Sequence, residues 1–140
     1  FRIRRPFRDL AEVYHLLALL ESDAAAVVAE RAADAELREL QQLHQELEGA
    51  VKDRERFFEV NERFHMRLLE LANNRWRNQM VADLRKVMKL NRHNSLLKAG
   101  RIAESLAEHR SVMAAIEARD AAAAMARMRE HFTNGLEAAN

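Results

Sequence analysis

Apolar residues recur every three or four positions through most of this 140-residue chain, a spacing that places them on one face of an α-helix. The pattern predicts six helices, at about residues 9–31, 34–49, 53–73, 76–97, 103–118 and from residue 120 onwards. We expect Asp34, Asp53 and Asp120 to cap helix starts, and Gly49 and Gly100 to follow helix ends. With three glycines, one proline and abundant Ala, Leu, Glu and Arg, the chain favours helices over strands, so the expected fold class is all-α.

The fourth predicted helix has an expected buried stripe composed of Trp76, Met80, Leu84, Val87 and Met88. Elsewhere, four polar residues interrupt the apolar stripes. Asn61 and His65 lie four apart on one face of the third helix, and His109 and His131 replace apolar residues in the fifth and sixth. Three inward histidines on separate helices, with an amide oxygen one turn before the first, form the donor set of a metal site. A buried imidazole that is only hydrogen-bonded is the simpler interpretation of each histidine alone.

The remaining histidines lie beside their stripes, next to polar neighbours, and we expect solvent around all three: His15, His44 and His93. Balanced charge, with 23 Lys and Arg against 22 Asp and Glu, argues against nucleic acid as a direct partner of this piece. The chain has no cysteine, and no apolar run approaches the ~18 residues that span a membrane. These observations predict a soluble, cytoplasmic protein.

Three stretches of the chain resemble the FCD domain, the C-terminal effector domain of FadR-subfamily GntR transcription regulators: FFEVNERFHMRLL, EHRSVMAAIEARD and AMARMREHFTNG. The resemblance runs from about Tyr14 to Gly135 and suits the shorter, VanR-like members. It implies an antiparallel bundle of about six helices with a central metal and ligand site, and a homodimer. It also implies an N-terminal winged helix-turn-helix domain, outside this chain, that binds DNA. Residues 1–8 would then be the linker from that domain, and residues 9–140 the FCD-type ligand-binding domain.

The same resemblance implies that Asn61, His65, His109 and His131 bind one divalent metal ion, with zinc expected and nickel, manganese or iron as alternatives. The expected effector is a small carboxylate. Two residues depart from the family pattern: Asn61 is neutral where many members have Asp, and Leu17 replaces an Arg that contacts the effector in many members.

A carboxylate effector therefore needs another cation in this chain. Arg85 and Arg92 lie seven apart on the fourth helix, beside its apolar stripe, and we propose them as effector-binding residues. The alternative is that both are solvated surface charges.

We expect a sensor and no enzyme, but two alternatives have sequence support. Glu12 to His15 and Glu62 to His65 are both Glu-x-x-His, the spacing that dimetal helical bundles use. A hydrolase with one metal ion would need an inward general base, yet Glu108 and Glu130 precede their histidines by one residue and so point about 100° away. The third possibility is a dimerisation bundle that binds nothing.

Overall fold

The computed structural model describes residues 6–139, except for the side chains of residues 6–8 and 90. They form six helices, and no strand occurs within this part of the chain. The helices are α1 (Pro6–Arg31), α2 (Asp34–Glu48), α3 (Arg54–Ala72), α4 (Arg75–Ser95), α5 (Arg101–Glu117) and α6 (Ala121–Ala139). The predicted all-α class is therefore confirmed. Residues 6–8 of the predicted linker are the first residues of α1, and residues 1–5 lie outside the described residues.

Short polar side chains cap the starts of α3, α4 and α6. Asp53 accepts a hydrogen bond from the backbone N–H of Arg56 at the start of α3, and Asp120 accepts one from Ala123 at the start of α6. Both predicted caps are confirmed, because each carboxylate satisfies an N–H group that the first helical turn leaves unpaired. The prediction for Asp34 is wrong by one residue: Asp34 is the first residue of α2, and Ala33 is the N-cap.

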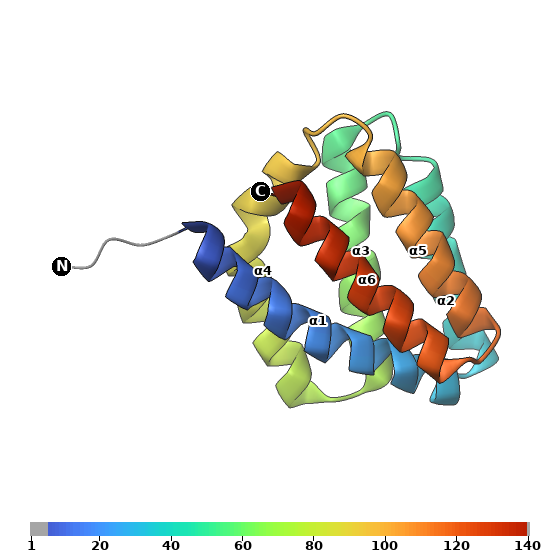
Figure 1. Ribbon diagram of the computed structural model, residues 1–140. Coiled ribbons are helices and arrows are strands. Elements are labelled where there is room, and N and C mark those ends of the chain that lie inside the picture. The colour runs from blue at the N-terminus through green and yellow to red at the C-terminus, as the bar shows by residue number, and fades with distance from the viewer. Residues whose placement is uncertain (1–5, 140) are drawn as a thin grey trace.

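The helices pack as a bundle in which α1 and α6 lie side by side across one face, as Figure 1 shows in blue and red. Behind this pair, α3 occupies the middle of the bundle and contacts α1, α2 and α4. α5 packs along α6, and α4 packs against α1. Because α1, α3, α4, α5 and α6 all border the centre, side chains from five helices can meet there.

The inward face of α4 differs from the predicted stripe. Trp76, Met80 and Val87 are 69%, 51% and 66% exposed, so their predicted burial is wrong. The buried stripe instead runs through Val81, Arg85, Met88 and Arg92, at the same helical spacing but rotated around the axis. Two guanidinium groups therefore take positions that we expected to be apolar, and the prediction that Arg85 and Arg92 are solvated surface charges is also wrong.

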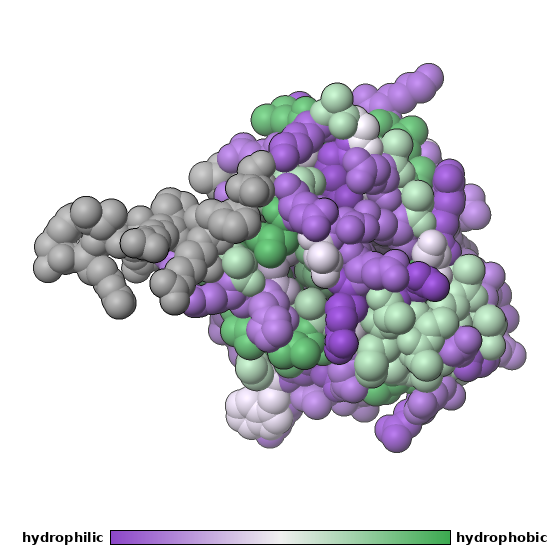
Figure 2. Space-filling view, viewed as in Figure 1, coloured by the Kyte–Doolittle hydropathy of each residue, from purple (hydrophilic) through white to green (hydrophobic). Residues whose placement is uncertain are grey.

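The surface over α1 and α6 is mixed in character. Figure 2 shows hydrophilic residues over most of this face, with separate hydrophobic areas, one of them pale green over the alanine-rich start of α6. No helix in the described part of the chain combines the length and the hydrophobicity that crossing a membrane requires.

Candidate metal centre

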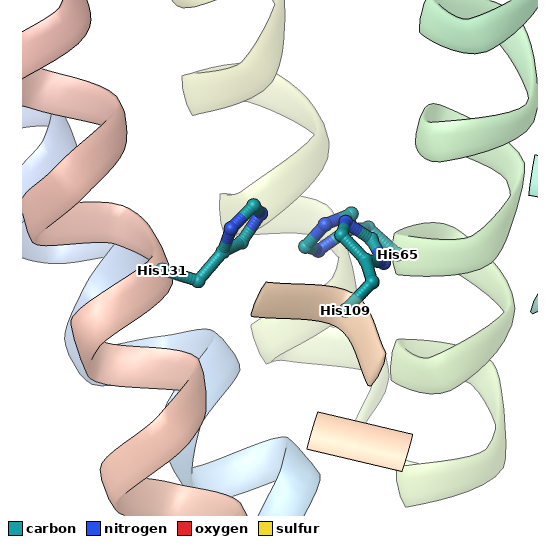
Figure 3. Close-up of side chains that lie close together, drawn as sticks. All are labelled: His65, His109 and His131. Carbon is teal, nitrogen blue, oxygen red and sulfur yellow. The ribbon is translucent and has the colours of Figure 1, made fainter. Parts of the chain in front are cut away.

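Three buried imidazole rings converge at the centre of the bundle. Figure 3 shows His65 from α3, His109 from α5 and His131 from α6 with their rings directed toward one another. The ring centroids are 5.0 Å apart for His65 and His109, 5.4 Å for His65 and His131, and 4.7 Å for His109 and His131. One nitrogen from each ring can be chosen so that all three lie within 4.8 Å of one another. The predicted meeting of these three side chains is confirmed.

Two of the three rings are oriented by carboxylates. The Nδ1 atom of His65 lies 2.5 Å from Oε1 of Glu21, a fully buried residue of α1. The Nδ1 atom of His131 lies 2.6 Å from Oε1 of Glu108 on α5. A carboxylate only accepts hydrogen bonds, so each Nδ1 donates its proton, and each Nε2 keeps its lone pair. Histidines that bind metals commonly have this arrangement, in which a carboxylate fixes the tautomer and the ring orientation.

Several buried polar atoms on these three histidines and on Asn61 have no hydrogen-bond partner among the described residues. The histidine atoms among them are Nε2 of His65, Nε2 of His131 and both ring nitrogens of His109. Oδ1 of Asn61, one turn before His65 on α3, is also buried without a partner. The amide nitrogen of Asn61 donates to Oε1 of Glu62 at 3.5 Å, and the amide oxygen of Asn61 takes no part in this contact. Because an unsatisfied buried polar group costs about 1–3 kcal/mol, so many of them in one place need an explanation.

This donor set suits a divalent metal ion. Imidazole nitrogens bind zinc and other transition metals at about 2.0–2.1 Å, so two nitrogens on one ion can lie at most about 4.2 Å apart. The three nitrogens lie within 4.8 Å of one another, so they are at or close to the separation that one ion requires. The three buried histidines can therefore form a metal site.

The protonation states agree with metal binding. Burial lowers the pKa of His65 and His109 well below the usual value, and the neighbouring cationic groups lower both further. Burial also lowers the pKa of His131 to about 4, although the contact with Glu108 opposes the shift. All three imidazoles are neutral near pH 7, which is the form that binds a metal ion.

Each of the two orienting carboxylates is in turn paired with an arginine side chain. Arg85 donates from Nε to Oε2 of Glu21 at 3.1 Å and from Nη1 to Oε1 of Glu62 at 2.7 Å. Burial raises the pKa of Glu21 and Arg85 opposes this, since the guanidinium favours the carboxylate form. A contiguous set of contacts thus runs from α4 through Glu21 to His65.

The partner of His131 is held in the same way. Arg101 is 2% exposed and donates to both oxygens of Glu108 at 2.9 Å, and Asn134 donates to Oε2 at 3.0 Å. Burial alone would raise the pKa of Glu108, but the hydrogen bonds from His131 and Arg101 outweigh it and lower the pKa to about 2. Glu108 is therefore a carboxylate that orients His131.

Arg92 differs from these two arginines. It is 2% exposed, and its Nε and Nη2 atoms have no hydrogen-bond partner. It forms no ion pair within residues 6–139. A built Cβ on Gly135, one turn after His131 on α6, would lie 3.7 Å from Nη1 of Arg92 and 3.7 Å from Nη2 of Arg101. Arg92 thus presents an unpaired cation close to the histidines.

The other histidines only partly match their prediction of solvent exposure. His15 is exposed, as predicted. For His44 the prediction is wrong, because its side chain is buried and its Nε2 atom lies 3.0 Å from Glu48. His93 is half-buried against the ring of Phe58, with 3.7 Å between the ring centroids. None of the three belongs to the group of imidazoles whose nitrogens lie within 4.8 Å of one another.

The structure also reveals residues that the sequence reasoning missed. Glu21 occupies the same helical face as Leu17, Ala24 and Val28, which are all buried, so its position in an apolar stripe was a detectable signal. Arg101 follows Gly100 at the first turn of α5, and nothing in its local pattern indicated burial. The Glu-x-x-His pair of α1 does not belong to the centre, because Glu12 and His15 are exposed.

Residues 12–134 match the model of the FCD domain family. No curated protein matches the sequence. Solved structures do match: Escherichia coli McbR/YncC has 25% identity and a TM-score of 0.83 over 93% of this chain and 67% of its own. Streptococcus agalactiae GntR has 24% identity and a TM-score of 0.80, and the match covers 96% of this chain but 61% of the other.

A third structure is that of Lar, described as controlling the expression of the Listeria monocytogenes agr system. It has 17% identity and a TM-score of 0.80 over 98% of this chain and 65% of its own. At this identity, the likeness shows the fold alone. The chain therefore spans about two thirds of the length of these proteins.

Proposed function

The chain belongs to the FCD domain family, the ligand-sensing regulatory domains of GntR-family transcription regulators, and we propose that it senses a small carboxylate through a bound divalent metal ion. The expected ligands of the metal are His65, His109, His131 and Asn61. One observation carries the proposal: the three imidazoles converge in the buried centre with nitrogens that have no partner, while Glu21 and Glu108 orient two of the rings.

Zinc is the ion that we propose first, since a site made mainly of imidazoles suits zinc, with nickel, manganese and iron as alternatives. When bound, the ion supplies a Lewis-acid position that a carboxylate oxygen can occupy. The protein residues do the rest. The histidines hold the site in a region without solvent access, and Phe64, whose ring centroid is 5.1 Å from that of His109, provides an apolar wall.

Of the two arginines proposed for the effector, Arg92 is the better placed. Arg85 is engaged by Glu21 and Glu62, so we assign it the task of holding Glu21 in position. Arg92 has unpaired N–H groups, and it could take the place of the arginine that many family members have at the position of Leu17. The rest of the proposal concerns parts beyond this chain: a DNA-binding domain before residue 1 would respond to the effector, and residues 1–8 would connect to it.

The regulatory assignment is favoured over an enzymatic one by specific contacts. Glu12 and His15 lie on the surface, so the dimetal arrangement lacks half of its ligands. Glu108 is committed to Arg101 and His131, and Glu130 is exposed beside Arg127, so neither serves as a general base at the centre.

The decisive experiment is to measure bound zinc by elemental analysis after loading and gel filtration. We expect one ion per chain in the parent protein and none in the His109→Ala variant, because His109 contributes a ligand and makes no other polar contact within the described residues. His15→Ala is the matched control, since its imidazole is exposed, and it should retain one ion. No ion in the parent protein, or equal loading of His109→Ala, would overturn the proposal.

A thermal-shift screen of small organic acids tests the effector. A ligand that binds only the folded state raises the melting temperature by mass action. We expect acids to stabilise the zinc-loaded protein and to have no effect after chelation. Equal shifts in both samples would place the binding site away from the metal.

We further propose a homodimer, supported by the apolar side chains that α4 exposes. Trp76, Met80 and Val87 share one outward stripe, and patches of this kind mark association sites. In analytical ultracentrifugation, Met80→Glu combined with Val87→Glu should yield monomers. Ala122→Glu, at an exposed position of α6, should leave the dimer intact. Equal sedimentation of the two variants would contradict this interface.

A further inference from the structure

The centre of the bundle contains a second group of polar atoms without partners, one helical turn from the histidines. It consists of Nε and Nη2 of Arg92, the hydroxyl of Tyr14 and the hydroxyl of Ser105, all buried and without hydrogen-bond partners in residues 6–139. We call Tyr14, Arg92, Ser105 and Gly135 the Arg92 subsite. Gly135 belongs to it because a built Cβ would lie 3.2 Å from Cε2 of Tyr14 and 3.7 Å from Nη1 of Arg92.

The Arg92 subsite is adjacent to the metal centre on two helices. Gly135 follows His131 by four residues on α6, and Ser105 precedes His109 by four on α5, so each pair lies on one face. A shift of four residues along a helix is about 6 Å. Because the guanidinium of Arg92 lies beside Gly135, it is about one helical turn from His131.

The charges of the interior also require an anion here. The carboxylates of Glu21 and Glu62 contact Arg85, and that of Glu108 contacts Arg101. Arg92 has no carboxylate of its own, yet arginine remains protonated in proteins. These three carboxylates balance the three guanidiniums, and because the histidines and Asn61 are neutral, a divalent metal ion leaves two positive charges uncompensated.

We propose that the effector is a short dicarboxylate, with one carboxylate at the metal and the other held by Arg92 and Tyr14. This inference rests on the function proposed above and adds a second anionic group to it. A dicarboxylate brings two negative charges, which neutralises the centre, and it distributes them between two separate points. Hydrogen bonds between a guanidinium and a carboxylate are charge-assisted, and in a buried site they discriminate strongly against a methyl group at the same place.

Calorimetric titration of the zinc-loaded domain with acids of equal carbon number provides the test. The pairs are succinate with butyrate, and glutarate with pentanoate. We expect one of the two dicarboxylates to bind at least about 10-fold more tightly than its monocarboxylate partner, since each charge-assisted hydrogen bond contributes about this factor. In Arg92→Met the preference should vanish while the monocarboxylate affinity stays the same. Arg127→Met, an exposed arginine of α6, is the matched control and should keep the preference.

Stability distinguishes a ligand-binding role of Arg92 from a structural one. A buried cation without a partner does not stabilise the fold, so Arg92→Met should melt at the same temperature as the parent or higher. If it melts lower, Tyr14→Phe decides: it removes one hydroxyl but keeps the ring against Phe132, and it should reduce dicarboxylate affinity alone.

The two proposals fail in different ways. Three results would overturn the inference and leave the metal-dependent sensor intact. The first is zinc-dependent binding of monocarboxylates that is as tight as that of dicarboxylates, and the second is a preference for dicarboxylates that survives both Arg92→Met and Tyr14→Phe. The third is tighter binding of inorganic phosphate than of either dicarboxylate. Absence of bound zinc in the parent protein would overturn both.

Discussion

Replacing Glu21 by Gln tests whether the carboxylates beside the histidines support metal binding. The substitution keeps the shape of the side chain and removes its charge. In the parent, Oε1 of Glu21 lies 2.5 Å from Nδ1 of His65, whose other nitrogen faces the centre. A neutral amide accepts a weaker hydrogen bond, so the ring is held less firmly and its Nε2 atom is less basic. We expect zinc affinity to fall about 10- to 100-fold, or about 1.4–2.8 kcal/mol.

The folded state should survive this change. Breaking a buried ion pair costs about 3–5 kcal/mol when a charge is left without any partner. Arg85 retains its contact with Glu62 at 2.7 Å, so the loss of stability should be smaller than that. Circular dichroism under the titration conditions verifies that the variant is folded.

The assay is a competition titration against a chelator of known zinc affinity at pH 7. Glu39→Gln is the matched control, because Glu39 is a half-exposed carboxylate that binds Arg67 on the surface, and surface pairs contribute little. Its zinc affinity should equal that of the parent. If folded Glu21→Gln binds zinc as tightly as the parent, then Glu21 does not position His65 for the metal.

Three further outcomes are expected. Asn61→Asp adds a charged oxygen to the centre and should tighten zinc binding in the same competition assay, whereas unchanged or weaker binding would argue against Asn61 as a ligand. In the metal-free domain burial lowers the pKa of His131 to about 4, below its usual value of about 6.5, so the unfolded state binds the proton first. As the pH falls from about 6.5 to 4, His131 alone should reduce stability by about 3 kcal/mol, and His65 and His109 should add to the loss because burial lowers their pKa values too. Urea unfolding that is flat over this range would contradict the prediction. Arg119 donates to the carbonyls of Ala29 and Ala32 at the end of α1, so Arg119→Ala should cost about 1–2 kcal/mol in urea unfolding, while a change below about 0.3 kcal/mol would show that water replaces this cap.

The positions of Asn61, His65, His109 and His131 could be predicted because each interrupts a clear apolar stripe, and a helix fixes which residues share a face. The inward face of helix α4 was harder to predict, because apolar residues do not mark it. Its inward residues include Arg85 and Arg92, and a pattern based on hydrophobicity assigns arginine to the outside. Which face of α4 turns inward is decided by partners on other helices, such as Glu21 on α1, and spacing within one helix cannot show those partners.

Contacts between helices were also invisible in the sequence. Glu108 was expected to point about 100° away from His109, and it does serve a different histidine, His131 on α6. Arg101 was missed for a different reason: it contacts Glu108 two turns later on the same helix, but an arginine at the start of a helix is usually exposed. The ligands of the proposed site were thus accessible to sequence reasoning, but the residues that orient them were not.

Helix α1 is a single rod that reaches the centre at two levels. Tyr14 belongs to the Arg92 subsite, Glu21 orients a histidine, and the helix continues without interruption back to Pro6. Pro6 lies fifteen residues before Glu21, which is about 22 Å along the helix. A tilt of about 5° around Glu21 would therefore displace the start of the helix by about 2 Å. A small shift of the Tyr14 hydroxyl and the Glu21 carboxylate on ligand binding would thus move the start of α1 by about 2 Å, far from the place where the ligand binds.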